Sequence, residues 1–245
     1  MCMQQAIEIT GLRKTYRNAK HETLHGLSIS IPKGQFIGIL GPNGAGKTTT
    51  ISCITGVTSP TGGKVTVHGH DVVEEYREAR ARIGVSPQDF TIDIFQTVDE
   101  ILDYQAGFFG IVGEEMKKKR EELLELFELT SHRDKKFQVL SGGLKRRTML
   151  AKAMMHNPDV LILDEPTAGV DVETRQSLWK YLRKLHGEGK TILLTSHYLE
   201  EVEALCERVA IIKDGAIIKD SPMKELVNNG QKLEEVYLTL IGHSA

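Results

Sequence analysis

The segment from Gly41 to Thr48 carries residue types that hold phosphate groups. Its sequence, GPNGAGKT, fits the pattern GxxxxGK[ST], with the apolar run QFIGIL before it and helical sequence after it. Glycines let backbone N–H groups converge on phosphate oxygens, and a helix start adds the positive end of its dipole. In such a loop Lys47 reaches the β and γ phosphates, and the Thr48 hydroxyl faces Mg²⁺. The correct flanking elements argue against a chance match. The residues that we expect to bind here are Gly41, Pro42, Asn43, Gly44, Ala45, Gly46, Lys47, Thr48 and Thr49.

Two adjacent carboxylates, Asp164 and Glu165, follow the apolar run VLIL. Ligands of open α/β sheets bind at the carboxyl ends of the strands, which is where this pattern places both acids. We expect Asp164 to hold Mg²⁺ and Glu165 to polarise a water molecule in line with the γ phosphate. A solvated acidic turn is the alternative, and the apolar run and the phosphate-binding loop disfavour it.

A second set of residues suited to anions is Ser141, Gly142 and Gly143, which open a helix with Ser141 near the N-cap. The basic residues Lys145 to Arg147 follow. One chain does not need two γ-phosphate sites. These residues are therefore predicted to serve a nucleotide that another subunit holds.

Strand and helix patterns surround these motifs. Short strands are expected near residues 7–31, with further ones at 65–67 and 83–86. From about residue 90 to 140 apolar residues recur every three or four positions, which predicts a helical insert. The runs VLILD, TILLTS and VAIIKDG are then separated by helical sequence, which is typical of βαβ units. We predict an α/β fold with a mostly parallel sheet.

Composition excludes several classes of protein. The chain has 245 residues, a net charge of −2 and a mean hydropathy of −0.23, which are globular rather than disordered or fibrous values. No apolar run reaches the roughly 18 residues of a membrane span. Cys2, Cys53 and Cys206 form no CxxC pair, and the start MCMQQAIEIT lacks a secretory signal, so we expect reduced thiols and a cytoplasmic location.

Taken in order, the motifs resemble those of the nucleotide-binding subunits of ATP-binding cassette (ABC) transporters over almost the whole chain. Tyr16 is similar to the family's aromatic residue that stacks on adenine, with strand packing as its alternative, and Gln88 resembles the glutamine that contacts Mg²⁺. Residues 141–143 resemble the family signature. Ala168, Gly169, Val170 and Asp171 resemble the loop that crosses the dimer interface, and His197 resembles the switch histidine that contacts the γ phosphate.

This resemblance implies a P-loop NTPase fold with an N-terminal antiparallel β subdomain and an inserted α-helical subdomain. We expect a single ABC ATPase domain over residues 1–245. Its RecA-like core would cover 1–88 and 157–220, the helical subdomain about 89–156, and a short C-terminal helix 222–245.

The resemblance also implies an ATP-dependent homodimer and a separate polytopic membrane permease. Each ATP would be bound by one chain and by residues 141–143 of the other, with Thr48, Gln88 and Asp164 as Mg²⁺ ligands. Glu165, His197 and Lys47 would be catalytic. Leu144 stands where the family usually has Gln. This departure puts in doubt only the contact that the glutamine side-chain amide would make with the sugar or the partner subunit. No nucleic acid partner is expected.

The stretches LSGGLKRR, DEPTAGVD and LEEVYLTLIGH resemble ABC-2 type exporter subunits, which lie on the cytoplasmic face of the inner membrane. Four phenylalanines of the helical insert, Phe90, Phe95, Phe108 and Phe109, have two interpretations. They form its core, or they line a groove for a helix of the permease.

Two other classes of protein remain as alternatives. A soluble ABC-type ATPase that acts on nucleic acid or ribosomes is disfavoured, because we expect neither the long coiled coil of DNA-repair relatives nor the tandem cassettes of ribosomal ones. A catalytically inactive binding module is disfavoured because Lys47, Asp164, Glu165 and His197 are all present.

Overall fold

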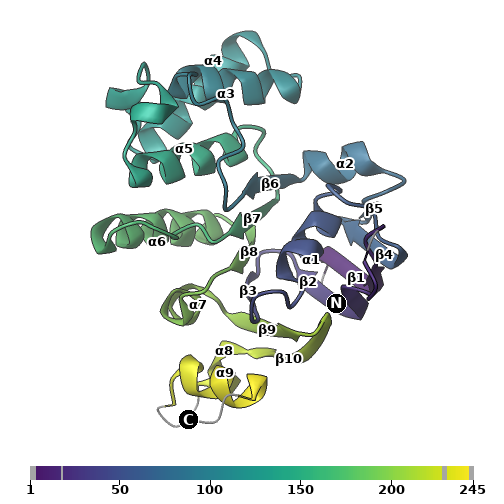
Figure 1. Cartoon of the computed structure of the whole chain (residues 1–245). Coiled ribbons are helices and arrows are strands. Elements are labelled where there is room, and N and C mark those ends of the chain that lie inside the picture. Colours follow the sequence, from purple (N-terminus) through teal and green to yellow (C-terminus); the bar gives the residue numbers. More distant parts are fainter. Residues whose placement is uncertain (1–3, 18, 228–230, 243–245) are drawn as a thin grey trace.

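The strands of the protein form two sheets, with helices on both faces of the larger one (Figure 1). The computed structural model describes residues 4–17, 19–227 and 231–242. Cys2 and parts of the expected C-terminal helix at 222–245 lie outside these residues, whereas Cys53 and Cys206 are buried free thiols. In the part of the chain that the structure describes, no helix combines the length and the apolar character needed to cross a bilayer.

The larger sheet is mostly parallel, as its apolar runs predict. Its order is β10 (Ala216–Pro222), β9 (Arg208–Lys213), β3 (Phe36–Leu40), β8 (Thr191–Thr195), β7 (Val160–Asp164) and β6 (Ile83–Ser86). Only β10 pairs antiparallel among these described strands. Every residue of β3 and β8 is buried, because helices or strands cover both faces of the sheet. The carboxyl ends of the parallel strands therefore meet at one edge.

The smaller sheet is antiparallel and covers one face of the larger sheet together with α1. Its order is β2 (Leu24–Pro32), β1 (Gln5–Lys14), β4 (Gly62–Val67) and β5 (His70–Asp71). Buried and exposed residues alternate along β2, so one of its faces is apolar. That face packs with Ile54 of α1 (Lys47–Ile54) and Ile37 of β3 in one hydrophobic cluster.

α2 packs in the cluster of α1 through Ala79, whereas most of the remaining helices pack on the opposite face or extend beyond β6. Figure 1 shows α6 and α7 beside the parallel strands, and α3, α4 and α5 together beyond them. A second hydrophobic cluster joins these helices to β3, β7 and β8. The bounds are α2 (Tyr76–Ala81), α3 (Val98–Phe108), α4 (Gly113–Leu126), η1 (Thr130–His132), η2 (Phe137–Val139), α5 (Gly142–Met154), α6 (Val172–Gly187), α7 (Leu199–Leu205), α8 (Met223–Leu226) and α9 (Leu233–Ile241). The predicted fold class is confirmed, and the domain boundaries stay a prediction.

Arg146 on α5 connects the helical elements to the end of β6. Its Nη1 donates to the carbonyl oxygens of Pro87, at 3.2 Å, and Gln88, at 2.8 Å. Its guanidinium lies 4.7 Å from the ring centre of Phe90, and only 6% of the residue is exposed. Burial lowers the pKa of Arg146, with Asp89 acting in the opposite direction. This buried cation therefore fixes the chain that follows β6.

We expect Arg146→Lys to lower the free energy of unfolding by about 1–3 kcal/mol, because a lysine keeps the charge but loses the planar fork that meets both carbonyls. Denaturant unfolding followed by circular dichroism measures this. Lys145→Ala is the matched control on the same helix, and its expected cost is below about 1 kcal/mol because the contact of Lys145 with Phe137 is a weak cation–π contact at 5.7 Å. Equal losses in the two variants would contradict the bridging role.

Candidate functional site

The phosphate-binding loop connects β3 to α1. Gly46, at the N-cap of α1, has φ 107°, which favours glycine, and a Cβ there would lie 2.6 Å from Leu24 Cδ2. Lys47 is 8% exposed, and its Nζ donates to the carbonyl oxygens of Gly41, at 2.7 Å, and Pro42, at 3.1 Å. Burial lowers the pKa of Lys47, while the nearby carboxylates of Glu165 and Asp164 act in the opposite direction.

Three side chains from different strand ends converge beside this loop. The Nε2 atom of Gln88 donates to Glu165 Oε2 at 3.0 Å, and His197 Nε2 lies 2.5 Å from Glu165 Oε1. Glu165 follows β7 with φ 51°, an uncommon backbone conformation for a non-glycine residue. Gln88 follows β6 and His197 follows β8, so the parallel sheet brings these residues together. His197 is about half exposed and can therefore contact a ligand as well as Glu165.

A cavity of about 330 Å³ joins these groups to the phosphate-binding loop. It is a polar hollow suited to the phosphate end of a nucleotide. Its lining consists of Thr23, Asn43, Gly44, Gly46, Lys47, Thr48, Thr49, Gln88, Glu165 and His197. Sequence reasoning missed Thr23, because β1 and β2 position it and no motif marks it.

The residues expected to hold Mg²⁺ offer oxygen atoms, which is the donor type that this cation prefers. They are the Thr48 hydroxyl, the Gln88 side-chain oxygen and the Asp164 carboxylate. Thr195 Oγ1 donates to Asp164 Oδ1 across β7 and β8, which orients the carboxylate. Among the described residues no cluster of three His, Cys, Asp or Glu side chains could hold a metal alone. Mg²⁺ fits such a sparse set, since it usually keeps several water molecules and binds substrate phosphates.

Tyr16 lies beside the start of α1. Its hydroxyl is 3.3 Å from Thr49 Oγ1, and 44% of the residue is exposed. Lys14 Nζ lies 5.2 Å from the ring centre. The strand-packing alternative is weakened by this exposure, because a packed side chain would be covered. An exposed ring next to a phosphate-binding loop can stack on a base.

The residues of the second anion motif lie on a different part of the chain. Ser141 is the N-cap of α5, and its Oγ accepts from Leu144 N at 3.3 Å. Asp171 is the N-cap of α6, where it accepts from Thr174 N at 2.8 Å. Gly143 faces this helix, because a Cβ there would lie 2.6 Å from Thr174 Cγ2. Figure 1 shows α5 well separated from α1, and within the described chain residues 141–143 do not line the cavity of the phosphate-binding loop.

Arg146 lies outside the lining of the cavity but supports the segments around it, and no motif in the sequence singled it out. Besides binding the carbonyls of Pro87 and Gln88, it approaches the Ala168 carbonyl oxygen at 3.5 Å. It therefore connects the helix of Ser141 with the segments that carry Gln88 and Asp171. Arg146 stands among the basic residues Lys145 to Arg147, and nothing in this run indicates that its side chain is buried.

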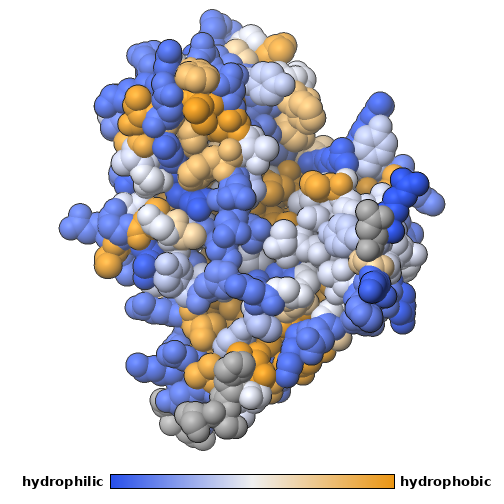
Figure 2. All heavy atoms as spheres, viewed as in Figure 1, coloured by the Kyte–Doolittle hydropathy of each residue, from blue (hydrophilic) through white to orange (hydrophobic). Residues whose placement is uncertain are grey.

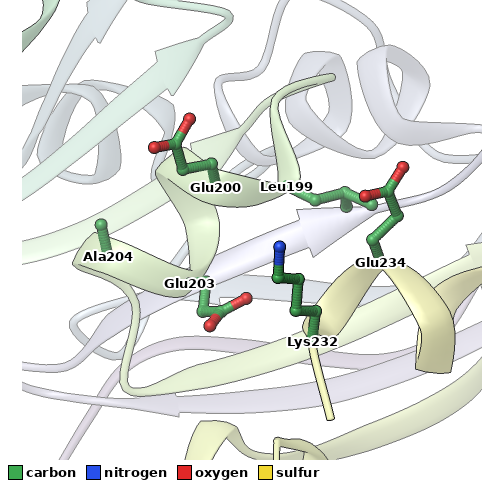
Figure 3. A pocket seen from close by; sticks show the side chains of 6 residues that line it. All are labelled: Leu199, Glu200, Glu203, Ala204, Lys232 and Glu234. Carbon is green, nitrogen blue, oxygen red and sulfur yellow. The ribbon is translucent and has the colours of Figure 1, made fainter. Parts of the chain in front are cut away.

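Two further hollows differ in chemistry from the phosphate-binding cavity. One lies between α7 and α9, and Figure 3 shows Glu200, Glu203 and Glu234 around Lys232 there. Its acidic lining would repel a triphosphate. The other has a volume of about 650 Å³ and is lined by the segment that follows β6, by α3 and by Lys152 of α5. Its lining includes Phe90, Ile92, Ile101 and Tyr104.

The four phenylalanines of the helical region divide between the two interpretations. Phe90 is partly buried, and Phe109 stacks on His156 with ring centres 3.7 Å apart. Phe95 and Phe108 are 61% and 75% exposed. Figure 2 shows apolar side chains among polar ones on the surface over α3 to α5. The helical region therefore has both a packed core and an apolar surface.

Comparisons with known proteins identify the family of the chain. The family model described as "ABC transporter" matches residues 24–168. The chain is 40% identical to the Nod factor export ATP-binding protein I of Ralstonia nicotianae over 94% of its length and 72% of that relative. It is also 39% identical to a linearmycin resistance ATP-binding protein of Bacillus subtilis, over 86% of its length and 68% of that relative.

Solved structures show the same fold. A dimeric ATP-binding cassette in a post-hydrolysis state, bound to ADP and phosphate, superposes with a TM-score of 0.81 at 27% identity, covering 89% of this chain and 98% of that one. The matched family region contains the phosphate-binding loop, the signature and the acid pair. The chain therefore belongs to the ABC transporter family and is the ATP-hydrolysing subunit of such a transporter.

Proposed function

We propose that this ATPase drives an exporter of the ABC-2 type through a separate membrane permease, from the cytoplasmic face of the membrane. The observation that carries the site assignment is the meeting of Gln88 and His197 on the Glu165 carboxylate, beside Lys47. The export function named for the Ralstonia relative supports the transport direction. It also favours a transporter over a soluble ATPase that acts on nucleic acid.

In the proposed site the loop amides and Lys47 bind the β and γ phosphates, and the Tyr16 ring stacks on adenine. Lys47 exchanges its bonds to the Gly41 and Pro42 carbonyls for phosphate oxygens. Thr48, Gln88 and Asp164 would hold Mg²⁺, which would supply positive charge to offset that of the phosphates. Thr195 keeps the Asp164 carboxylate in place.

Glu165 positions the attacking water and His197 assists at the γ phosphate. The contacts of Glu165 with Gln88 and His197 support this role, because its carboxylate then lies beside a proposed Mg²⁺ ligand and a proposed phosphate-binding side chain. A water molecule placed here is polarised by the carboxylate, while His197 and Lys47 stabilise the charge on the transferring phosphoryl group. Hydrolysis then follows from positioning and electrostatics.

The second half of each site comes from another copy of the chain. Ser141, Gly142 and Gly143 begin a helix whose amides suit an anion, yet they lie away from the cavity of their own chain. In a head-to-tail dimer they would contact the γ phosphate of the partner copy, and the loop ending at Asp171 would lie at the interface. Closure would require the γ phosphate, and its loss on hydrolysis would release the dimer.

The hollow between α3 and the segment that follows β6, whose lining mixes apolar side chains with Asp93 and Lys152, is the proposed docking site for the permease. Its lining combines Phe90 and Tyr104, and Tyr104 is 69% exposed. A short helix of a membrane protein could insert its apolar side chains here. Gln88 and Phe90 lie on the segment that follows β6, and Gln88 contacts Glu165. A displacement of this segment by the permease would therefore also move Gln88 relative to Glu165.

Glu165→Gln should lower the steady-state rate of ATP hydrolysis by about 100-fold or more, because an amide polarises water poorly, while ATP binding is kept. Phosphate release and nucleotide-binding fluorescence measure the two properties. Glu188→Gln removes an exposed carboxylate distant from the site and should hydrolyse ATP at the wild-type rate. Wild-type hydrolysis in Glu165→Gln would refute the water-positioning role.

Ser141→Arg should abolish ATP-dependent dimerisation, because a long cationic side chain would fill the space of the γ phosphate at the signature. Light scattering with ATP, in the Glu165→Gln background that preserves ATP, measures the dimer. Ser131→Arg places the same side chain at an exposed position of η1 and should leave the dimer intact. Persistence of the dimer in Ser141→Arg would show that the signature does not close it.

Tyr104→Glu should lower recovery of the chain with membranes that contain its permease by about tenfold or more, because it places a charge among the apolar side chains of the docking hollow. Co-sedimentation measures recovery, and the hydrolysis rate of the isolated chain should stay unchanged. Val57→Glu changes an exposed apolar residue that follows α1 and is the control. Equal recovery of all three proteins would place docking elsewhere.

A further inference from the structure

A completely buried carboxylate lies next to the ATP site without touching its cavity. Glu201 on α7 has 0% exposure, and each of its oxygens accepts a hydrogen bond. Oε1 accepts from Trp179 Nε1 at 3.0 Å, and Oε2 accepts from Ser196 Oγ at 2.6 Å. Burial raises the pKa of Glu201, and these two donors act in the opposite direction. A buried carboxylate is costly, so its partners indicate what it is placed to hold.

Ser196, one of the two donors to Glu201, holds the segment that carries His197. Ser196 immediately precedes His197, is 4% exposed and also accepts from Tyr198 N at 3.0 Å. The backbone on both sides of His197 is thus tied to one buried hydroxyl, which Glu201 orients. His197 itself is only half buried, and its Nε2 lies 2.5 Å from Glu165 Oε1. Its position therefore depends on the buried residues next to it.

Trp179, the other donor to Glu201, connects the His197 segment to α6. Trp179 is on α6, which begins after its N-cap Asp171 in the proposed dimer-interface loop. A second contact joins the same two segments, because the Arg175 guanidinium lies 4.6 Å from the ring centre of Tyr198. Two residues of one helix thus approach the His197 segment, one of them through Glu201. Figure 1 shows α6 and α7 side by side along the sheet.

We propose that Glu201 is a positioning residue for ATP hydrolysis, which holds the His197 segment through Ser196 and ties it to α6 through Trp179. The inference rests on the proposed role of His197 and extends it. The Glu201 carboxylate accepts hydrogen bonds from both Trp179 and Ser196, and so keeps the Ser196 hydroxyl in one orientation. Because Ser196 precedes His197, this also keeps the His197 ring at its distance from Glu165. The alternative is that Glu201 only satisfies the indole N–H of Trp179 in the core.

Glu201→Gln tests the proposal, because the amide keeps the shape but cannot accept with both ends. We expect kcat to fall by about 10- to 100-fold, as for other small displacements of catalytic groups, with KM for ATP within about twofold of wild type. Glu200→Gln is the matched control, since Glu200 is the preceding carboxylate of α7 and faces the hollow with α9 instead (Figure 3). It should keep both constants.

A double-mutant cycle separates positioning from a structural role. In a His197→Ala background Glu201→Gln should lower kcat no further, because the histidine through which it acts is gone. An equal additional loss in that background would overturn this inference and leave the role of His197 intact. Wild-type hydrolysis by His197→Ala alone would overturn both.

Ser196→Ala provides a second variant in case Glu201→Gln folds poorly. It removes the link to the His197 segment while Trp179 still donates to Glu201. The same fall in kcat with unchanged KM is expected, with thermal unfolding measured in parallel. An unchanged kcat, or a loss of activity that follows only the fraction of unfolded protein, would refute positioning by Glu201.

Discussion

The contact on which the site depends is the meeting of two side chains at the carboxylate of Glu165. Gln88 and His197 approach it from the ends of two other strands, and both contacts require β6, β7 and β8 to be parallel and adjacent. Parallel order places all three carboxyl ends at one edge of the sheet. The buried apolar residues of these strands hold that order, so the core determines where the carboxylate is.

The same arrangement explains why the chain is proposed to work in pairs. Its phosphate-binding loop and its strand ends form one cavity, while Ser141 begins a helix that does not line this cavity. Arg146 joins that helix to the segments of Gln88 and Asp171 through backbone carbonyls. A displacement of the helical region would therefore also displace Gln88. This connection links the proposed permease hollow and the proposed dimer contact to the site of hydrolysis.

The local patterns of the sequence were sufficient to predict the buried parallel strands and the loop before α1. The apolar runs of β3, β7 and β8 marked strands that are buried on both faces, and the glycine pattern marked the loop before α1. The sequence could not show which polar residues are buried, because burial depends on contacts between distant segments. Arg146 stands in a run of basic residues and Glu201 beside other acids, and neither pattern distinguishes a buried side chain from an exposed one. The exposure of Phe108 and the stacking of Phe109 likewise depend on tertiary packing.

The hydrogen bonds of Lys47 to the carbonyls of Gly41 and Pro42 have a consequence for turnover. A buried ammonium without partners would make departure of the product costly. Because the loop offers these carbonyls, the cation has acceptors both before ATP arrives and after ADP leaves. In the proposed site, the affinity of Lys47 for phosphate would then reflect the difference between two hydrogen-bonded states rather than the full energy of its new contacts.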